Sequence, residues 1–244
     1  MPELRLSRGV GQSGYHHLDT LGHVFEVVER VGSELSGGDL GASVPEDRHD
    51  ALLLAALLHD LAKPLTRGEL SPAGGGSGRV VFVAHDTVGA ELARSVCAAL
   101  GASALQTDAA TTLTALHLKI GFMQNERTDH PPGRLVLAAG PFGEELAVLS
   151  WADRLAAQGS SLTEEQLRNH RDLCLEFLEA SRTAGPHPEP DYGVVRRAVA
   201  DPGVSEAGVG YLAGRVRNCV VRGMDPEEAV SFAVRFSGRV AGGR

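Results

Sequence analysis

Histidine and aspartate residues recur along this chain in segments that are otherwise apolar. His59 and Asp60 end the most apolar segment, DALLLAALLHDL over Asp50–Leu61. An ionised carboxylate buried beside an imidazole is costly unless something compensates its charge, and a divalent metal ion would do so. Further residues of metal-ligand type lie on separate predicted helices: His23, His85, His117 and Asp153. Side chains placed in this way can converge in the core of a helical bundle, where bundle proteins build metal sites.

Helical patterns dominate the segments that carry these residues. Apolar residues recur at the helical period over Gly22–Leu35, Glu91–Leu100, Asp108–Ile120, Glu144–Ala157 and Thr163–Ala180. Arg79–Ala84 (RVVFVA) is the only strand-like stretch of the sequence, and it is too short to define a sheet. The pattern therefore predicts an all-α fold.

The composition marks a boundary near residue 184. Thr183–Pro190 (TAGPHPEP) is typical of a linker. The net charge also changes there, from −9 over residues 1–184 to +1 over residues 185–244. We expect a main domain over 1–184 and a small helical C-terminal segment over 185–244.

Charge and composition exclude several classes of protein. The net charge of −8 argues against a general nucleic-acid coating protein. No apolar run approaches the roughly 18–20 residues of a membrane span, and the first ten residues lack the apolar region of a secretory signal. Three sparse cysteines favour reduced thiols in a cytoplasm. We therefore expect a cytoplasmic protein without a membrane partner, and the sequence leaves its oligomeric state open.

The order H…HD…H…H…D, with LLHDLAKP in its middle, resembles the HD-domain metal-dependent phosphohydrolases over about residues 15–160. More narrowly, YHHLDTLGHVFEVVE, LLHDLAKPLT and FVAHDTVGAELA resemble the HD subdomain of bacterial tRNA nucleotidyltransferases. The chain begins at that subdomain, so we expect phosphohydrolase chemistry and not nucleotide addition. The resemblance implies an HD-type helical bundle followed by the C-terminal segment.

The resemblance also assigns roles to individual residues. It implies that a first metal binds His23, His59, Asp60 and Asp153, and that His85 and His117 hold a second metal in binuclear members. Lys63 follows the HD pair by three positions, where it can face a substrate phosphate, so Asp60 and Lys63 are the expected catalytic residues. His17 is a candidate for binding the phosphate. Alternatives stay open: one ion instead of two, His117 as a core histidine, and Lys63 as a cation favoured at a helix end.

The ligand types suit Mn, Fe, Mg, Ni or Co at a mixed nitrogen and oxygen site. Such a metal lowers the pKa of bound water and neutralises phosphate charge. The expected function is hydrolysis of nucleotide phosphomonoesters or 2′,3′-cyclic phosphodiesters, with a nucleotide or an RNA end as substrate. The alternative substrates are a nucleoside 5′-monophosphate and a signalling nucleotide such as a guanosine polyphosphate. The alternative from another class is a non-catalytic module that binds nucleotides or RNA ends.

Overall fold

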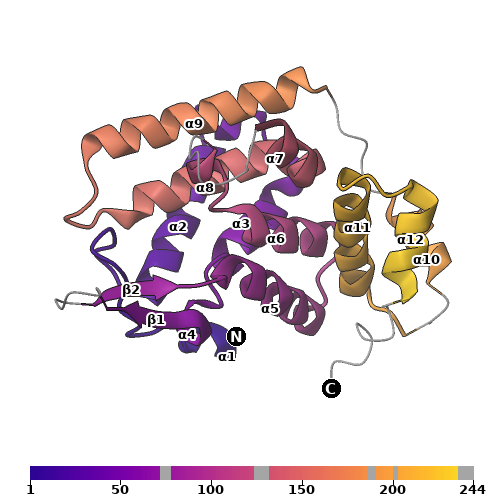
Figure 1. Cartoon of the computed structure of the whole chain (residues 1–244), viewed down its shortest axis with the longest axis horizontal. Coiled ribbons are helices and arrows are strands. Elements are labelled where there is room, and N and C mark those ends of the chain that lie inside the picture. Colours follow the sequence, from indigo (N-terminus) through magenta and orange to yellow (C-terminus); the bar gives the residue numbers. More distant parts are fainter. Residues whose placement is uncertain (72–77, 124–131, 186–190, 200–202, 236–244) are drawn as a thin grey trace.

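The computed structural model describes residues 1–71, 78–123, 132–185, 191–199 and 203–235. Helices form nearly all of its regular structure (Figure 1), which confirms the all-α class. The α-helices are α1 (Pro2–Arg5), α2 (Thr20–Leu35), α3 (His49–Leu58), α4 (Lys63–Thr66), α5 (His85–Leu100), α6 (Ala104–Leu116), α7 (Pro132–Ala139), α8 (Gly143–Ala157), α9 (Glu164–Thr183), α10 (Tyr192–Ala198), α11 (Glu206–Val221) and α12 (Pro226–Arg235). Short 3-10 turns are η1 (Gly41–Ser43), η2 (Glu46–Arg48), η3 (Ile120–Phe122) and η4 (Gly140–Phe142).

Helix α3 lies at the centre of the bundle. It packs against α2, α6 and α8, and Leu52, Ala55 and Leu58 are fully buried. This environment explains why the segment is apolar on every side. The helix ends at Leu58, so His59 and Asp60 follow its last turn deep inside the molecule.

Capping sets the start of the neighbouring helix α6. Ser103 and Gln106 form a capping box, in which each side chain bonds the other residue's backbone N–H. The helix therefore starts at Ala104, four residues before the start at Asp108 predicted from apolar spacing, and ends at Leu116. His117 follows the helix in the same way that His59 follows α3.

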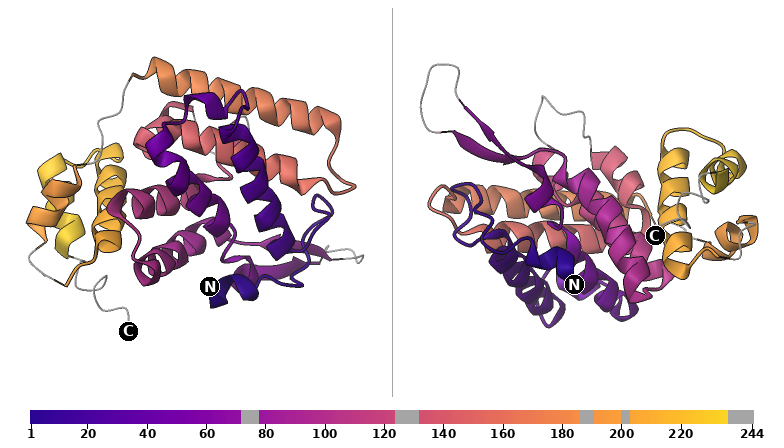
Figure 2. Two further views of the ribbon diagram at one scale, coloured as in Figure 1. Left: turned by 180° about the vertical axis from the view of Figure 1, so that it is seen from behind. Right: turned by 90° about the horizontal axis from the view of Figure 1, so that it is seen from below.

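Two short strands form a hairpin, and the sequence pattern indicates only the second of them. β1 (Arg67–Leu70) pairs antiparallel with β2 (Arg79–Phe82), with Arg67 opposite Phe82 and Leu70 opposite Arg79. The RGEL sequence of β1 carries glycine and charged residues, which are poor strand formers, so propensity does not reveal it. The hairpin extends from one side of the bundle (Figure 2).

Helices α10, α11 and α12 gather at one end of the molecule (Figures 1 and 2) around a small apolar cluster that includes Val195 and Leu212. Helix α11 packs along α6 and contacts α5 and α7. A Cβ atom at Gly210 would collide with the Ala104 carbonyl oxygen, so glycine permits this close approach. Residues 186–190 of the predicted linker lie outside the described residues. The division into 1–184 and 185–244 stays a prediction.

The stretch Pro132–Ala157 is long and apolar enough, by composition, to cross a membrane. However, 72% of its most apolar window is buried inside the bundle, and core helices of globular proteins meet the same criterion.

Candidate metal centre

Three histidines are held by the same local contact. In each, the ring Nδ1 lies 2.7 Å from the carbonyl oxygen of the residue three positions earlier in the chain. The pairs are His59 with Ala56, His85 with Phe82, and His117 with Thr114. Because a carbonyl oxygen can only accept, Nδ1 carries a proton, and in the neutral ring Nε2 presents a lone pair. This arrangement is the usual one for histidines that bind metals through Nε2.

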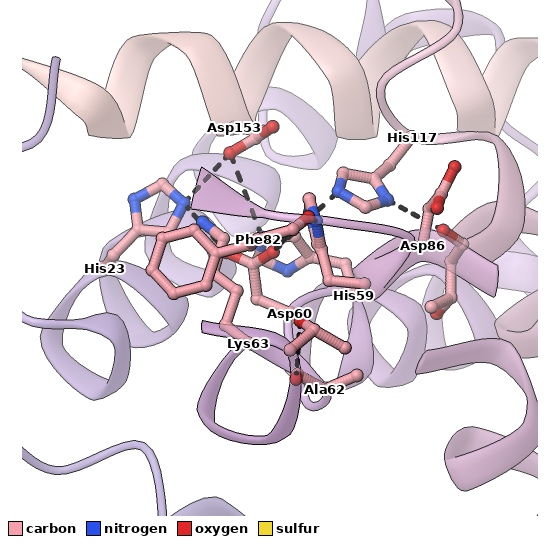
Figure 3. Close-up of polar contacts among 12 residues, drawn as sticks. His23, His59, Asp60, Ala62, Lys63, Phe82, Asp86, His117 and Asp153 are labelled. Atoms are coloured by element: carbon pink, nitrogen blue, oxygen red, sulfur yellow. Dashed lines mark hydrogen bonds and ion pairs between the residues drawn. The ribbon is translucent and has the colours of Figure 1, made fainter. Parts of the chain in front are cut away.

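The Asp60 carboxylate lies at the centre of the imidazoles (Figure 3). Its Oδ1 atom lies 3.4 Å from Nε2 of His85 and 3.8 Å from Nε2 of His117. Its Oδ2 atom lies 3.2 Å from Nε2 of His59 and 3.5 Å from Nε2 of His23. The two oxygens thus face different pairs of histidines.

Asp153 comes from α8, on the side of the centre nearest His23 (Figure 3). Its Oδ1 atom lies 2.9 Å from Nε2 of His23 and 3.8 Å from Nε2 of His59. Two groups of three result, each with ligand atoms within 4.8 Å of one another. The first is His23, His59 and Asp153, and the second is Asp60, His85 and His117. All six residues that the sequence selects as metal ligands therefore converge.

Several buried polar atoms of this cluster have no hydrogen-bond partner among the described residues. They are Nδ1 of His23, Nε2 of His59, Nε2 of His117, and Oδ1 and Oδ2 of Asp60. Buried polar atoms are normally satisfied, because an unpaired one costs free energy. The converging imidazole nitrogens and carboxylate oxygens are donor atoms that divalent metals accept, so the residues present fit a divalent metal.

The charges of the cluster agree with this interpretation. Burial alone would raise the pKa of Asp60, but His59 and Lys63 outweigh it and hold that pKa well below its usual range. Burial is likewise outweighed at Asp153, where His23 and His59 keep the pKa low. Burial, with a contribution from His59, lowers the pKa of His117 to about 4. Near neutral pH the cluster therefore holds two carboxylates and a neutral His117.

The cluster forms the floor of a cavity of about 570 Å³, a size typical of small-molecule sites. His85, His117 and Asp153 are the members of the cluster that line the cavity. Strand β2 lines one wall, and the first half of α9 lines another. A ligand in the cavity can therefore contact the metal-binding side chains directly.

A family model for the HD domain matches residues 15–158, which is more than half of the chain. The chain belongs to the HD domain family. We call the six candidate metal ligands the HD centre, and all of them lie within the matched range: His23, His59, Asp60, His85, His117 and Asp153.

Two relatives among curated proteins are tRNA nucleotidyltransferases. The A-adding enzyme of Deinococcus radiodurans is 32% identical over 218 residues, which cover 82% of this chain and 46% of that protein. The CC-adding enzyme of Thermus thermophilus is 40% identical over 95 residues, which cover 39% of this chain and 19% of that protein. The chain thus spans less than half the length of these relatives.

Lys63 reaches the HD centre as a buried cation. Its side chain is 7% exposed, and its Nζ lies 2.6 Å from Oδ2 of Asp60. The ammonium donates to the side-chain oxygen of Gln12 at 2.6 Å and lies 5.4 Å from the ring centre of Phe82. It also lines the cavity. Lys63 therefore touches both the metal-binding carboxylate and the space that a substrate would fill.

Of the two neighbouring histidines before the HD centre, the structure places His16 in the cavity and not His17. His17 is exposed, and its Nδ1 lies 3.1 Å from the Ala157 carbonyl. His16 lines the cavity with its ring centre 4.8 Å from that of His23. Burial, with help from Lys63, lowers the pKa of His16 to about 3, so the ring is neutral near pH 7. The sequence YHHLD gives no signal that separates the two rings, and phosphate binding by His17 stays a prediction.

Proposed function

We propose that this HD domain is a metal-dependent phosphohydrolase that cleaves nucleotide phosphomonoesters or 2′,3′-cyclic phosphodiesters. One observation carries the proposal: two groups of ligand side chains converge on Asp60 beneath a cavity that His85, His117 and Asp153 line, and several of their buried polar atoms have no hydrogen-bond partner among the described residues. A structural cluster would have paired those atoms internally.

The ligand geometry favours two ions. His23, His59 and Asp153 would hold one ion together with Oδ2 of Asp60, and His85 and His117 would hold the other together with Oδ1 of Asp60. The mixed nitrogen and oxygen donors suit Mn, Fe, Mg, Ni or Co. Such ions lower the pKa of water and balance phosphate charge.

The residues of the chain prepare the site for this chemistry. The backbone carbonyls fix the imidazole tautomers before any ligand arrives. Lys63 holds Oδ2 of Asp60 in place and sets a positive charge at the edge of the cavity, beside the expected phosphate. Burial excludes bulk water from the floor, which strengthens electrostatic interactions there.

The relatives support a substrate that is a nucleotide or an RNA end, because their names describe addition of nucleotides to tRNA. A non-catalytic module that binds such ends is the alternative from another class. The complete ligand set argues against it, because a binding module needs no second metal group. A hydrolase of a signalling nucleotide would use the same metal-binding residues, and the residues of the cavity walls would select a different substrate.

Hydrolysis assays with purified protein test this proposal. We expect Mn²⁺-dependent release of phosphate from an aryl phosphate, and opening of adenosine 2′,3′-cyclic phosphate, both abolished by EDTA. Asp60→Asn should abolish both activities. Asp39→Asn is its matched control, because Asp39 is an exposed aspartate that pairs with Arg171 on the surface. Tight nucleotide binding without turnover under any of the candidate metals would favour the binding module instead.

A further inference from the structure

Arg154 places a cation in the cavity that the described residues leave unneutralised. It follows the metal-binding residue Asp153 on α8, is half-buried, and lines the same cavity. It forms no hydrogen bond or ion pair with any residue in the described ranges. Lys63 differs from it, because the Lys63 ammonium is already held by Asp60 and Gln12.

The field of Arg154 reaches the α9 wall of the cavity. Burial is the main cause that lowers the pKa of His170 to about 4, and the Arg154 guanidinium is the next. His170 lines the cavity, and its Nε2 lies 3.0 Å from the Ser150 carbonyl, so this ring donates there and does not neutralise the guanidinium. Arg154 therefore places a positive charge between α8 and α9, next to the carboxylate of Asp153.

The position of this charge relative to the HD centre suggests its ligand. Asp153 and Arg154 are consecutive, with Cα atoms about 3.8 Å apart. Both residues line the cavity, so an anion at Arg154 shares the cavity with the metal-binding side chains. Successive phosphates of a ribonucleotide chain are separated by one ribose. Phe82 and Leu173 give the cavity apolar surface for the nucleoside.

We propose that Arg154 binds a second phosphate of the substrate, namely the 5′-phosphate on the ribose whose 3′-side phosphoester is hydrolysed. The inference rests on the proposed function and specifies its substrate. A guanidinium is suited to this role because its planar donors bind two phosphate oxygens at once. The chemistry is shared by an RNA end and by a small nucleotide with a 5′-phosphate.

Three substrates distinguish the two sources. They are adenosine 2′,3′-cyclic phosphate, the same compound with a 5′-phosphate, and a dinucleotide that ends in a 2′,3′-cyclic phosphate. We expect kcat/KM to be about ten- to a hundred-fold higher for the two compounds that carry a 5′-phosphate, the gain of a charge-assisted hydrogen-bonded pair. A higher value for the dinucleotide than for the 5′-phosphorylated mononucleotide would identify the source as an RNA end.

Arg154→Gln should reduce this preference to near one, mainly through a higher KM for the 5′-phosphorylated substrates. Arg154→Lys should restore only part of it. The matched control is Arg168→Gln, because Arg168 is an exposed arginine on α9 that pairs with Glu164 outside the cavity. Equal rates for all three substrates in the wild type, or an unchanged preference in Arg154→Gln, would overturn the inference and leave the proposed function standing. No hydrolysis of any substrate would instead contradict the proposed function.

Discussion

Two buried aspartates, Asp60 and Asp108, are satisfied in opposite ways. Asp108 on α6 is fully buried, and Arg217 of α11 donates to both of its oxygens, at 2.7 Å and 3.0 Å. Thr112 and Tyr192 donate further hydrogen bonds to it. Asp60 is equally buried, yet neither of its oxygens has a contact of hydrogen-bond geometry among the described residues, although Lys63 lies close.

The difference separates a structural role from a binding role. The Asp108 carboxylate is complete without a ligand, and it joins the C-terminal helices to the bundle. The Asp60 carboxylate is surrounded by imidazole lone pairs, so a bound cation completes it. Burial alone does not distinguish the two regions, but the balance of donors and acceptors does.

The largest expected effect is that of Asp60→Asn on metal binding. The amide keeps the shape of the side chain but removes the charge that faces both histidine pairs. We expect metal affinity to fall at least about a hundred-fold, since even outer residues of metal sites reach that effect, and hydrolysis to be lost with it. Calorimetric titration of metal into the apo protein measures the first, and the aryl phosphate assay the second. Wild-type metal affinity in this variant would remove Asp60 from the site.

Asp108→Asn should instead act on stability. Breaking a buried ion pair by removing one partner costs about 3–5 kcal/mol of unfolding free energy, and here it leaves the Arg217 guanidinium without its counter-charge. Denaturant unfolding measures this cost, and metal content should stay at the wild-type value. Arg196→Gln is a control, because its pair with Glu206 is exposed to solvent and should contribute little to stability. A loss of metal with no loss of stability would reverse the roles of the two aspartates.

His170 predicts a dependence of stability on pH. Its folded-state pKa is lowered to about 4, mainly by burial, whereas an unfolded histidine titrates near 6.5. The unfolded chain therefore takes up the proton first, so this contribution to stability is complete above about pH 6.5 and is lost as the pH falls toward 4. The loss is at most about 3 kcal/mol. The difference in unfolding free energy between the wild type and His170→Asn should therefore shrink as the pH falls from about 6.5 toward 4. A difference that stays constant over this range would contradict the lowered pKa of His170.

The smallest effects are expected from the second group of ligands. His85→Ala and His117→Ala should each weaken one metal affinity at least about tenfold, or by about 1.4 kcal/mol or more. Binding through His23, His59 and Asp153 should persist. Titration of Mn²⁺ into the apo protein separates the two affinities. If both variants keep the wild-type stoichiometry and affinities, these histidines serve the substrate or the packing.

Much of this site can be predicted from the sequence, because each ligand stands out locally. His59 and Asp60 interrupt an apolar run, and the ordered series matches a family pattern. His23, His85 and Asp153 lie on helices and His117 directly follows one, and the bundle brings these helices together.

Features that depend on long-range pairing could not be predicted in this way. The interaction of Asp108 with Arg217 joins residues 109 positions apart, and each has the usual appearance of a residue on a solvated helix face. Strand β1 has no strand propensity of its own and forms because β2 lies beside it. His16 enters the cavity because backbone bonds from His17 to Ala157 and from Gly159 to Tyr15 fix the loop across the end of α8.

The metal content of the purified protein tests the central claim most directly. Elemental analysis of anaerobically prepared wild-type protein should find about two divalent ions per chain, and Asp60→Asn should lose them while Asp108→Asn keeps them. The two aspartates would then differ in metal binding as they differ in hydrogen bonding. A wild-type protein that holds no divalent metal, and takes up none on titration with Mn²⁺, would contradict the account.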